Sequence, residues 1–370
     1  MKITCAKSEL TNAMQIATKA VASKPQTPIL SATYMKAENG VLEIHATNNE
    51  IGLLCRTQAD VERPGEIAIN GRYFLDVIRK MPGDSVTIDF NKDENIVYIN
   101  SNQANFTLRS MNAAEFPKVK PIESNVDFTI KDNVLRSLIK KTVFACAKDE
   151  SRPVFTGCYL DINDSKVTMA ATNMHRLAVK YEQFPEQLGN IKIIIPSSTL
   201  LELMHNLNSD IPSDIKVSCN FNQISFAFDD IYMTSRLIEG AYPDYQHVIP
   251  KEHATLVTLD SVEFNSAVDR VSLISRGGDY NIVKLDFSNG QLKITSYNPE
   301  VGTAEETIPA AIEGPDITLS FNGQYLMDVL KVIDSKNCEL RLTQPLAPMT
   351  VKEEKDDAFI YVVTPVRTKN

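Results

Sequence analysis

A threefold internal repeat is the feature of this 370-residue chain that most constrains its fold. A row of apolar residues with helical spacing begins at Phe74 and returns at equal intervals at Leu200 and Leu326. A second helical row, which begins at Leu10, has two counterparts farther along the chain. Self-similarity at a fixed interval indicates one folding unit that is used several times.

Strand-like segments recur with the helices. Asn48, Asn173 and Asn298 are equally spaced, and each follows an alternating run of apolar and polar residues that predicts a strand. Two proline-marked segments, 117–121 and 243–250, predict linkers. We therefore expect an α+β fold of three repeated domains, each with antiparallel strands and two helices. The predicted domains are N-terminal (1–125), central (126–250) and C-terminal (251–370).

Three such units in a row can form an open arc. Two arcs related by a twofold axis would close a six-domain ring, head to tail, with helices inside, sheets outside and the terminal sheet edges paired. The alternative is three independent domains on flexible linkers. Apolar residues in the linkers, such as Val119 and Val248, favour rigid packing.

The net charge of −9 argues against a protein that grips nucleic acid through a basic domain. However, the predicted helices carry a positive balance, so the remainder is more negative than the whole chain. Helices inside a ring would then give it a mildly positive bore, which suits loose contacts with phosphates. The alternative is that Lys and Arg simply gather on solvated helix faces.

The sequence shows no apolar signal segment and no apolar run of about 18 residues, the length needed to span a membrane. Its six cysteines are scattered without a CxxC pair. We expect free thiols and a cytoplasmic protein, since disulfide frameworks belong to small secreted domains.

Motifs for nucleotide binding or hydrolysis, such as GxxxxGK[ST], HExxH and GxSxG, are missing. Asp89, Asn91 and Asp93 resemble the start of a calcium loop, but Glu94 stands where glycine is needed, which favours a polar hairpin turn. His175 beside Arg176 is the most reaction-like pair, yet it has no second histidine nearby. We expect no catalytic site, no metal and no cofactor.

Several segments carry a specific likeness: TPIL (27–30), ATNMHRLA (171–178), EGAYPDYQHVIP (239–250), ITSYNPE (294–300), FNGQYLMDVL (321–330) and YVVTPVR (361–367). In order and spacing they resemble the bacterial DNA sliding clamps, the beta subunits of DNA polymerase III, over essentially the whole chain. The resemblance implies a non-enzymatic processivity factor, a homodimer that encircles double-stranded DNA without reading its sequence. It also implies partners with short linear motifs: the polymerase III catalytic subunit, the clamp loader, other polymerases and repair proteins.

For these peptides the resemblance implies an apolar pocket between the central and C-terminal domains. The pocket residues that it indicates are Phe155, Thr172, Met174, His175, Arg176, Leu177, Pro243, His247, Val248, Met349, Val362, Val363, Thr364, Pro365, Val366 and Arg367. Two positions depart from the family pattern. Met174 replaces a small residue and Asn173 replaces an acidic one, and both changes bear on which peptides the pocket prefers.

The resemblance also indicates Lys24, Arg72, Lys148 and Arg152 as neighbours of DNA phosphates. For the dimer seam it indicates Phe106 and Leu108 on an edge strand, facing Leu273 and Ile274 of the C-terminal domain. The alternative for these four apolar residues is packing inside their own domain. Two other functions stay open: an enzyme that uses His175 and Arg176 in a cleft, and a scaffold that does not bind DNA.

Overall fold

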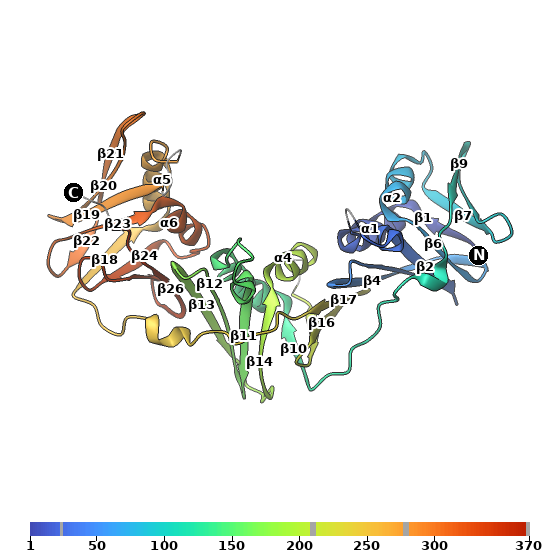
Figure 1. The fold of residues 1–370 in the computed structure, drawn as a ribbon, viewed down its shortest axis with the longest axis horizontal. Helices are drawn as coiled ribbons and strands as arrows, with labels where there is room; N and C mark the ends of the chain where they lie inside the picture. Colours follow the sequence, from blue (N-terminus) through green and yellow to red (C-terminus); the bar gives the residue numbers. More distant parts are fainter. Residues whose placement is uncertain (23–24, 208–211, 277–280, 368–370) are drawn as a thin grey trace. The chain divides into compact units, whose positions relative to one another are not determined.

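The computed structural model describes residues 1–22, 25–207, 212–276 and 281–367 (Figure 1). The chain forms two compact units. The first unit consists of Met1–Asn133 and Ser198–Leu237, and the second consists of Val134–Ser197 and Ile238–Asn370. Because the division falls inside the predicted central domain, the bounds of the three domains stay a prediction.

The first unit contains two antiparallel sheets. The smaller sheet has the order β5-β1-β7-β8-β9. Its strands are β1 (Lys2–Ala6), β5 (Asp60–Arg63), β7 (Ser85–Asn91), β8 (Ile96–Ser101) and β9 (Ala104–Arg109). Residues 92–95 form the turn between β7 and β8, where the sequence predicts a polar hairpin turn. β9 is an edge strand, and most of its side chains are exposed.

The larger sheet of the first unit has eight strands in the order β10-β15-β16-β17-β4-β3-β2-β6. They are β2 (Ala32–Glu38), β3 (Val41–Thr47), β4 (Ile51–Gln58), β6 (Gly65–Asn70), β10 (Val126–Lys131), β15 (Asp214–Cys219), β16 (Gln223–Phe228) and β17 (Ile231–Arg236). Met233 of β17 lies opposite Leu53 of β4. Through this pair of strands, one sheet continues from the predicted N-terminal domain into the predicted central domain.

The helices follow the predicted rows. In α1 (Lys7–Ala17) the buried residues are Leu10, Ala13, Met14 and Ala17, which share one face. This face packs against β4 and against α2 (Gly71–Lys80). Asn70 caps α2 because its side chain accepts a hydrogen bond from the Tyr73 backbone N–H. The counterpart of α2 in the second repeat is α4 (Ser197–Asn206).

The second unit is built on a nine-stranded sheet in the order β14-β11-β12-β13-β26-β25-β24-β18-β22. Its strands are β11 (Gly157–Asn163), β12 (Lys166–Thr172), β13 (Arg176–Gln183), β14 (Asn190–Pro196), β18 (Thr255–Asp260), β22 (Ala311–Glu313), β24 (Asn337–Leu342), β25 (Met349–Glu353) and β26 (Asp356–Val363). β13 pairs with β26, so that Leu177 faces Val362. Here too, one sheet crosses a predicted domain junction.

A four-stranded sheet completes the second unit, in the order β21-β20-β19-β23. It consists of β19 (Ile282–Ser288), β20 (Gln291–Asn298), β21 (Gly302–Pro309) and β23 (Ile317–Asn322). The helix α5 (Ser261–Ser272) packs on this sheet and on α6 (Gly323–Leu330). α3 (Asp132–Lys140) is the remaining α-helix of the described residues. No helix in the described part of the chain is long and apolar enough to cross a membrane.

Candidate functional site

A hollow of about 440 Å³ lies in the second unit, where β13 and β26 meet two 3-10 turns. These turns are η5 (Pro153–Thr156) and η6 (Tyr245–Val248). The lining consists of Arg152, Phe155, Thr172, Met174, His175, Arg176, Leu177, Pro243, Asp244, Tyr245, Val248, Pro348, Val362 and Thr364. Its surface is mainly apolar with a polar rim, which is the usual character of a pocket that binds organic ligands or peptides.

The structure brings most of the expected pocket residues together around this hollow. Those outside the lining are His247, Met349, Val363, Pro365, Val366 and Arg367. Met349 and Val363 are fully buried in the sheet. The His247 side chain is exposed and pairs with Asp244, with 3.0 Å between the charged groups. Asp244, Tyr245 and Pro348 line the hollow although sequence reasoning did not select them.

The turn between β12 and β13 forms one part of the rim, and hydrogen bonds within the turn hold it in place. The Thr172 hydroxyl donates to the Arg176 carbonyl at 2.6 Å and accepts from the Met174 N–H at 3.1 Å. The Asn173 side-chain oxygen accepts from the N–H groups of His175 and Arg176, both at 3.1 Å. Asn173 thus forms an Asx turn, and its hydrogen bonds fix the backbone conformation at Met174.

Aromatic packing forms the floor. Leu177, Val362 and Tyr245 belong to one buried cluster. Tyr242 stacks on Tyr159 with 4.9 Å between ring centroids, and Phe155 approaches the edge of Tyr242 at 6.1 Å. Burial raises the pKa of Tyr245 to about 12, so its phenol stays neutral at physiological pH. The floor is therefore an uncharged surface that favours apolar side chains.

Arg176 is buried beside the hollow, and its guanidinium connects separate segments of the chain. Its Nη1 donates to Asp328 Oδ2 at 2.6 Å, and its Nη2 donates to the Phe144 carbonyl. The guanidinium lies 4.5 Å from the Tyr325 ring centroid. Since these partners occupy the charged group, the arrangement does not offer Arg176 to His175 as a catalytic partner.

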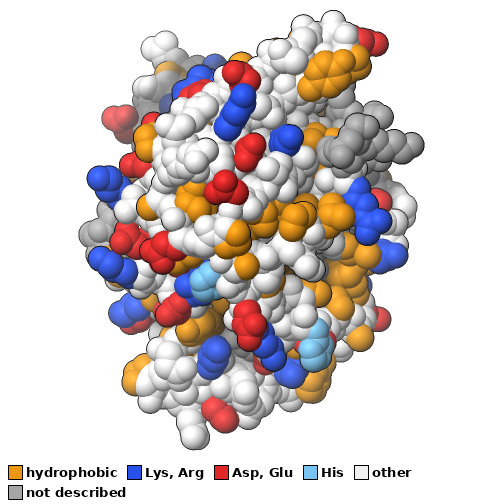
Figure 2. Space-filling model, turned by 90° about the vertical axis from the view of Figure 1, so that its left-hand side faces the viewer, with side chains coloured by type: hydrophobic (Ala, Val, Ile, Leu, Met, Phe, Trp, Pro, Cys, Tyr) orange, Lys and Arg blue, Asp and Glu red, His pale blue; other side chains and the backbone are white. Residues whose placement is uncertain are grey.

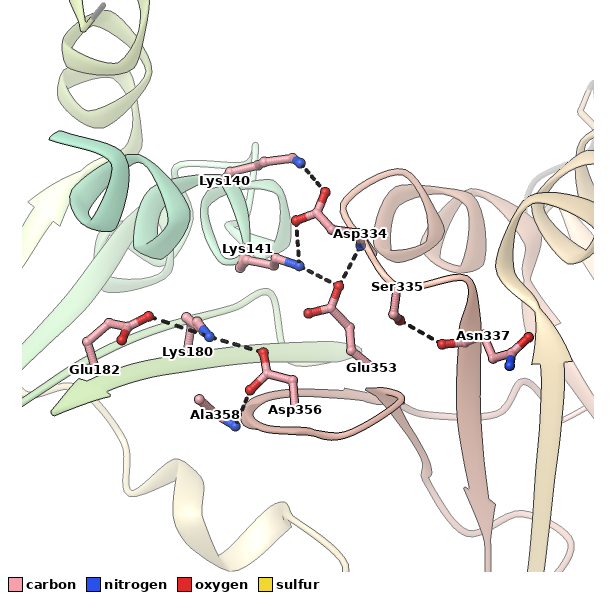
Figure 3. Close-up of polar contacts among 10 residues, drawn as sticks. All are labelled: Lys140, Lys141, Lys180, Glu182, Asp334, Ser335, Asn337, Glu353, Asp356 and Ala358. Carbon is pink, nitrogen blue, oxygen red and sulfur yellow. Dashed lines mark hydrogen bonds and ion pairs between the residues drawn. The ribbon is translucent and has the colours of Figure 1, made fainter. Parts of the chain in front are cut away.

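A network of charged side chains joins the predicted central domain to the predicted C-terminal domain (Figure 3). Lys141 Nζ lies 2.6 Å from Glu353 and 3.0 Å from Asp334. Lys180 Nζ lies 3.1 Å from Asp356. Together with Arg176, these lysines give the predicted central domain three buried cations that face acids of the predicted C-terminal domain. These ion pairs therefore fix β13 and β26, the two strands that line the hollow, relative to each other.

The four candidate phosphate neighbours are not brought together within one unit. Arg72 is exposed on α2 of the first unit, whereas Lys148 is exposed in the second. Arg152 lies at the rim of the hollow, where its guanidinium contacts Met174. Lys24 lies outside the described residues.

The candidate seam residues lie at the surface of their units. Phe106 on β9 is 42% exposed and Leu273, directly after α5, is 59% exposed. Leu108 and Ile274 are partly buried. Phe106 and Leu273 are therefore not packed into the interior of their own domains.

Among the described residues, no group of three or more His, Cys, Asp or Glu side chains is placed to hold a metal ion. The six cysteines are free and buried. Cys146 and Cys158 lie with their sulfurs 3.6 Å apart. Burial raises the pKa of the Cys158 thiol well above its usual value, which makes it a poor nucleophile.

Models of three protein domains match this chain almost from end to end. They describe the N-terminal domain of the DNA polymerase III beta subunit over residues 1–120, the central domain over 129–244 and the C-terminal domain over 246–367. The chain belongs to the DNA polymerase III beta subunit family. It is therefore a processivity clamp, an accessory subunit of DNA polymerase III and not a catalytic one.

Individual relatives agree. The beta sliding clamp of Staphylococcus epidermidis is 30% identical over the full length of both chains, and that of Staphylococcus aureus is 30% identical over 95% of each. Among solved structures, the sliding clamp of Bacillus subtilis is 29% identical, with a TM-score of 0.96 and complete coverage of both chains. The Pseudomonas aeruginosa clamp bound to griselimycin is also 29% identical, with a TM-score of 0.94 and complete coverage.

Proposed function

We propose that the hollow at β13 and β26 docks short peptide segments of the polymerase III catalytic subunit, the clamp loader and other replication and repair proteins. Its size and apolar floor suit one or two anchoring side chains, while exposed polar groups at the rim can meet a peptide backbone. The walls are held by buried ion pairs, so the hollow is formed before a ligand arrives. Such preorganisation lowers the entropic cost of binding.

The observation that carries this proposal is the contrast between two repeats of the same turn. Gly52 is the counterpart of Leu177 in the repeat that contains Asn48. At Gly52 a Cβ atom would lie 2.7 Å from the Thr234 hydroxyl and 3.0 Å from Cγ2 of Val119, since β17 and the chain's own linker both pack there. Around it, a smaller hollow of about 290 Å³ has a largely polar lining that includes Lys118, Lys120 and Arg236. Leu177 instead lines the larger hollow, whose surface is mainly apolar and which the segment 243–248 borders without filling.

Griselimycin offers a probe, because the structure of a clamp similar to this one contains it. We expect it to occupy the hollow of this chain. Phe155→Ala, which removes part of the floor, should weaken griselimycin binding about tenfold or more in isothermal titration, as large aromatic truncations do in buried contacts. Phe221→Ala, at an exposed residue of the first unit, is the matched control. Equal binding by wild type and Phe155→Ala would refute the assignment of the hollow.

We further propose that two copies of the chain close into a ring around duplex DNA in the cytoplasm. Support comes from two free sheet edges, β9 in the first unit and β21 in the second. Edge strands expose unpaired backbone groups that another copy can pair with. Exposed apolar side chains lie near them, among them Phe106, Leu273 and Tyr297. Figure 2 shows hydrophobic side chains gathered among charged ones on the face of the second unit that lies at the left of Figure 1.

A ring explains how a chain with a net charge of −9 can work on DNA. Topology holds the DNA, so the protein needs few firm phosphate contacts, and each firm contact would resist sliding. Arg72, Lys148 and Arg152, all exposed, are the described candidates for loose contacts. Retention on circular but not on linear DNA is the test of this proposal.

A further inference from the structure

We infer that Met174 and Arg152 form a movable cover over the hollow, and that Met174 limits which ligands enter. The inference rests on the proposed docking function and names a residue that sets its specificity. It follows from the backbone conformation of Met174, from its contact with Arg152 and from a comparison with the repeat of the same turn in the first unit.

The β12–β13 turn has a counterpart with the same hydrogen bonds. The Thr47 hydroxyl donates to the Ile51 carbonyl at 2.8 Å and accepts from the Asn49 N–H at 3.0 Å. The Asn48 side chain accepts from the N–H groups of Glu50 and Ile51. The bonds of Thr172 and Asn173 repeat this pattern residue by residue.

Both turns place their third residue in the left-handed region, with φ of 73° at Asn49 and 74° at Met174. Asparagine adopts this conformation readily, because its short polar side chain relieves the strain. Methionine does not have this advantage. Met174 is thus held in a disfavoured conformation by the hydrogen bonds of the turn, and its side chain gains no compensating burial, since it is 55% exposed. Folding alone gives no reason for methionine at this position.

The Met174 side chain contacts a second segment that lines the hollow. Met174 and Arg152 both line it, and they come from different segments: the β12–β13 turn and the residues just before η5. The guanidinium Nη1 of Arg152 lies against the Met174 sulfur. In the described part of the chain, no ion pair ties Arg152 to a carboxylate. The two side chains therefore join two segments of the lining through one weak contact.

A thioether is a poor hydrogen-bond acceptor, so an arriving carbonyl or carboxylate oxygen competes easily for Arg152. Once released, the unbranched Met174 side chain can repack against an apolar or aromatic group of the ligand. The ligand class that fits is a peptide with an apolar anchor side chain and an acceptor oxygen beside it. The cover slows entry and excludes groups that leave no room for the Met174 side chain.

The test compares griselimycin binding to wild type, Met174→Gly, Met174→Leu and Arg152→Ala by kinetic measurement on immobilised protein. Glycine accepts the left-handed conformation and removes the cover. For Met174→Gly, the association rate constant should therefore rise about threefold or more, and the Kd should fall about threefold or more. Met174→Leu keeps the bulk but not the sulfur contact, and should lose affinity no more than twofold or so. Arg152→Ala should raise the association rate constant, because the cover is removed. It should also raise the dissociation rate constant, because the bound ligand loses its contact with the guanidinium. The matched control is Asn49→Gly in the equivalent turn, with unchanged binding.

Binding to wild type that Phe155→Ala abolishes, together with an unchanged rate for Met174→Gly, would overturn the cover and leave the docking site standing. No binding to either wild type or Met174→Gly would instead overturn the docking site, and with it the cover. A higher association rate of griselimycin for both Met174→Gly and Asn49→Gly would also contradict the inference, since it would show that the effect comes from a general gain in backbone flexibility.

Discussion

Lys141 Nζ lies 2.6 Å from Glu353 Oε1, across 212 positions of sequence. The two side chains are only 4% and 6% exposed. A buried ion pair of this kind owes its geometry to the packing around it, and the loss of one partner leaves the other charge stranded in a dry site. The pair therefore fixes the position of the β25–β26 hairpin relative to the end of α3, and with it the β26 wall of the hollow.

Lys141→Met should destabilise the second unit by about 3–5 kcal/mol, because Glu353 would stay buried without its partner. Its neighbour gives a matched control. Lys140 pairs with Asp334 at 2.7 Å, but both side chains are well exposed, so Lys140→Met should cost only about 0–1 kcal/mol. Urea unfolding of the two variants measures the difference. Equal losses would show that burial of the Lys141 pair contributes nothing.

Acid should weaken the same junction. Burial alone would raise the pKa of Asp356, but hydrogen bonds from the Ala358 N–H and Lys180 outweigh it and hold that pKa below the usual value. Since the folded pKa is depressed, the contribution to stability is complete above the unfolded pKa of about 4. It is lost as the pH falls from there through the folded pKa. Unfolding free energies measured between pH 7 and pH 2 should show this decline.

Asp356→Asn removes the titrating group. The variant should be less stable than wild type at pH 7, and this difference should shrink below pH 4. A difference that stays constant over the whole range would contradict the role given to the ionised carboxylate.

Asn173→Ala should open the β12–β13 turn. The variant loses the acceptor for two backbone N–H groups and the donor to the Tyr325 hydroxyl, at a cost of about 1–2 kcal/mol. Griselimycin should bind it several-fold more weakly, because the rim residues lose their fixed position. Asn48→Ala removes the same turn bonds in the first unit, so it should lower stability without changing griselimycin binding.

Leu273→Asp should turn the proposed dimer into single chains in dilute solution, since a carboxylate would enter an apolar contact without a partner. Analytical ultracentrifugation at micromolar concentration measures the mass. Val262→Asp, at another exposed apolar residue of the same unit, serves as the control and should stay dimeric. A dimer of unchanged mass for Leu273→Asp would remove Leu273 from the seam.

The repeat was enough to predict the fold class and the buried faces of the helices. The spacing of Leu10, Ala13, Met14 and Ala17 depends only on local periodicity, and all four are buried on one side of α1. The same holds for Phe264, Ala267, Val268 and Val271 of α5. Local pattern predicts such faces because a helix of this length must bury its apolar side somewhere.

The site was harder to predict, because its chemistry depends on contacts between distant residues. Arg176 follows the motif, yet its role is decided by Asp328, which lies 152 positions away and carries no local signal. In the linker, the short 3-10 turn η6 buries Tyr245 and leaves His247 exposed, an assignment that motif likeness alone could not make. The resemblance indicates Arg152 as a neighbour of DNA phosphates, and only the fold shows that Arg152 also lines the hollow.

Retention on DNA tests the proposed encirclement most directly. The protein is loaded onto nicked circular duplex with a clamp loader and ATP, and the bound fraction is measured before and after the circle is cut. A ring held by topology predicts stable retention on the circle at moderate salt and rapid loss once the DNA is linear. Equal retention on both forms would mean ordinary phosphate binding and would contradict the proposed encirclement.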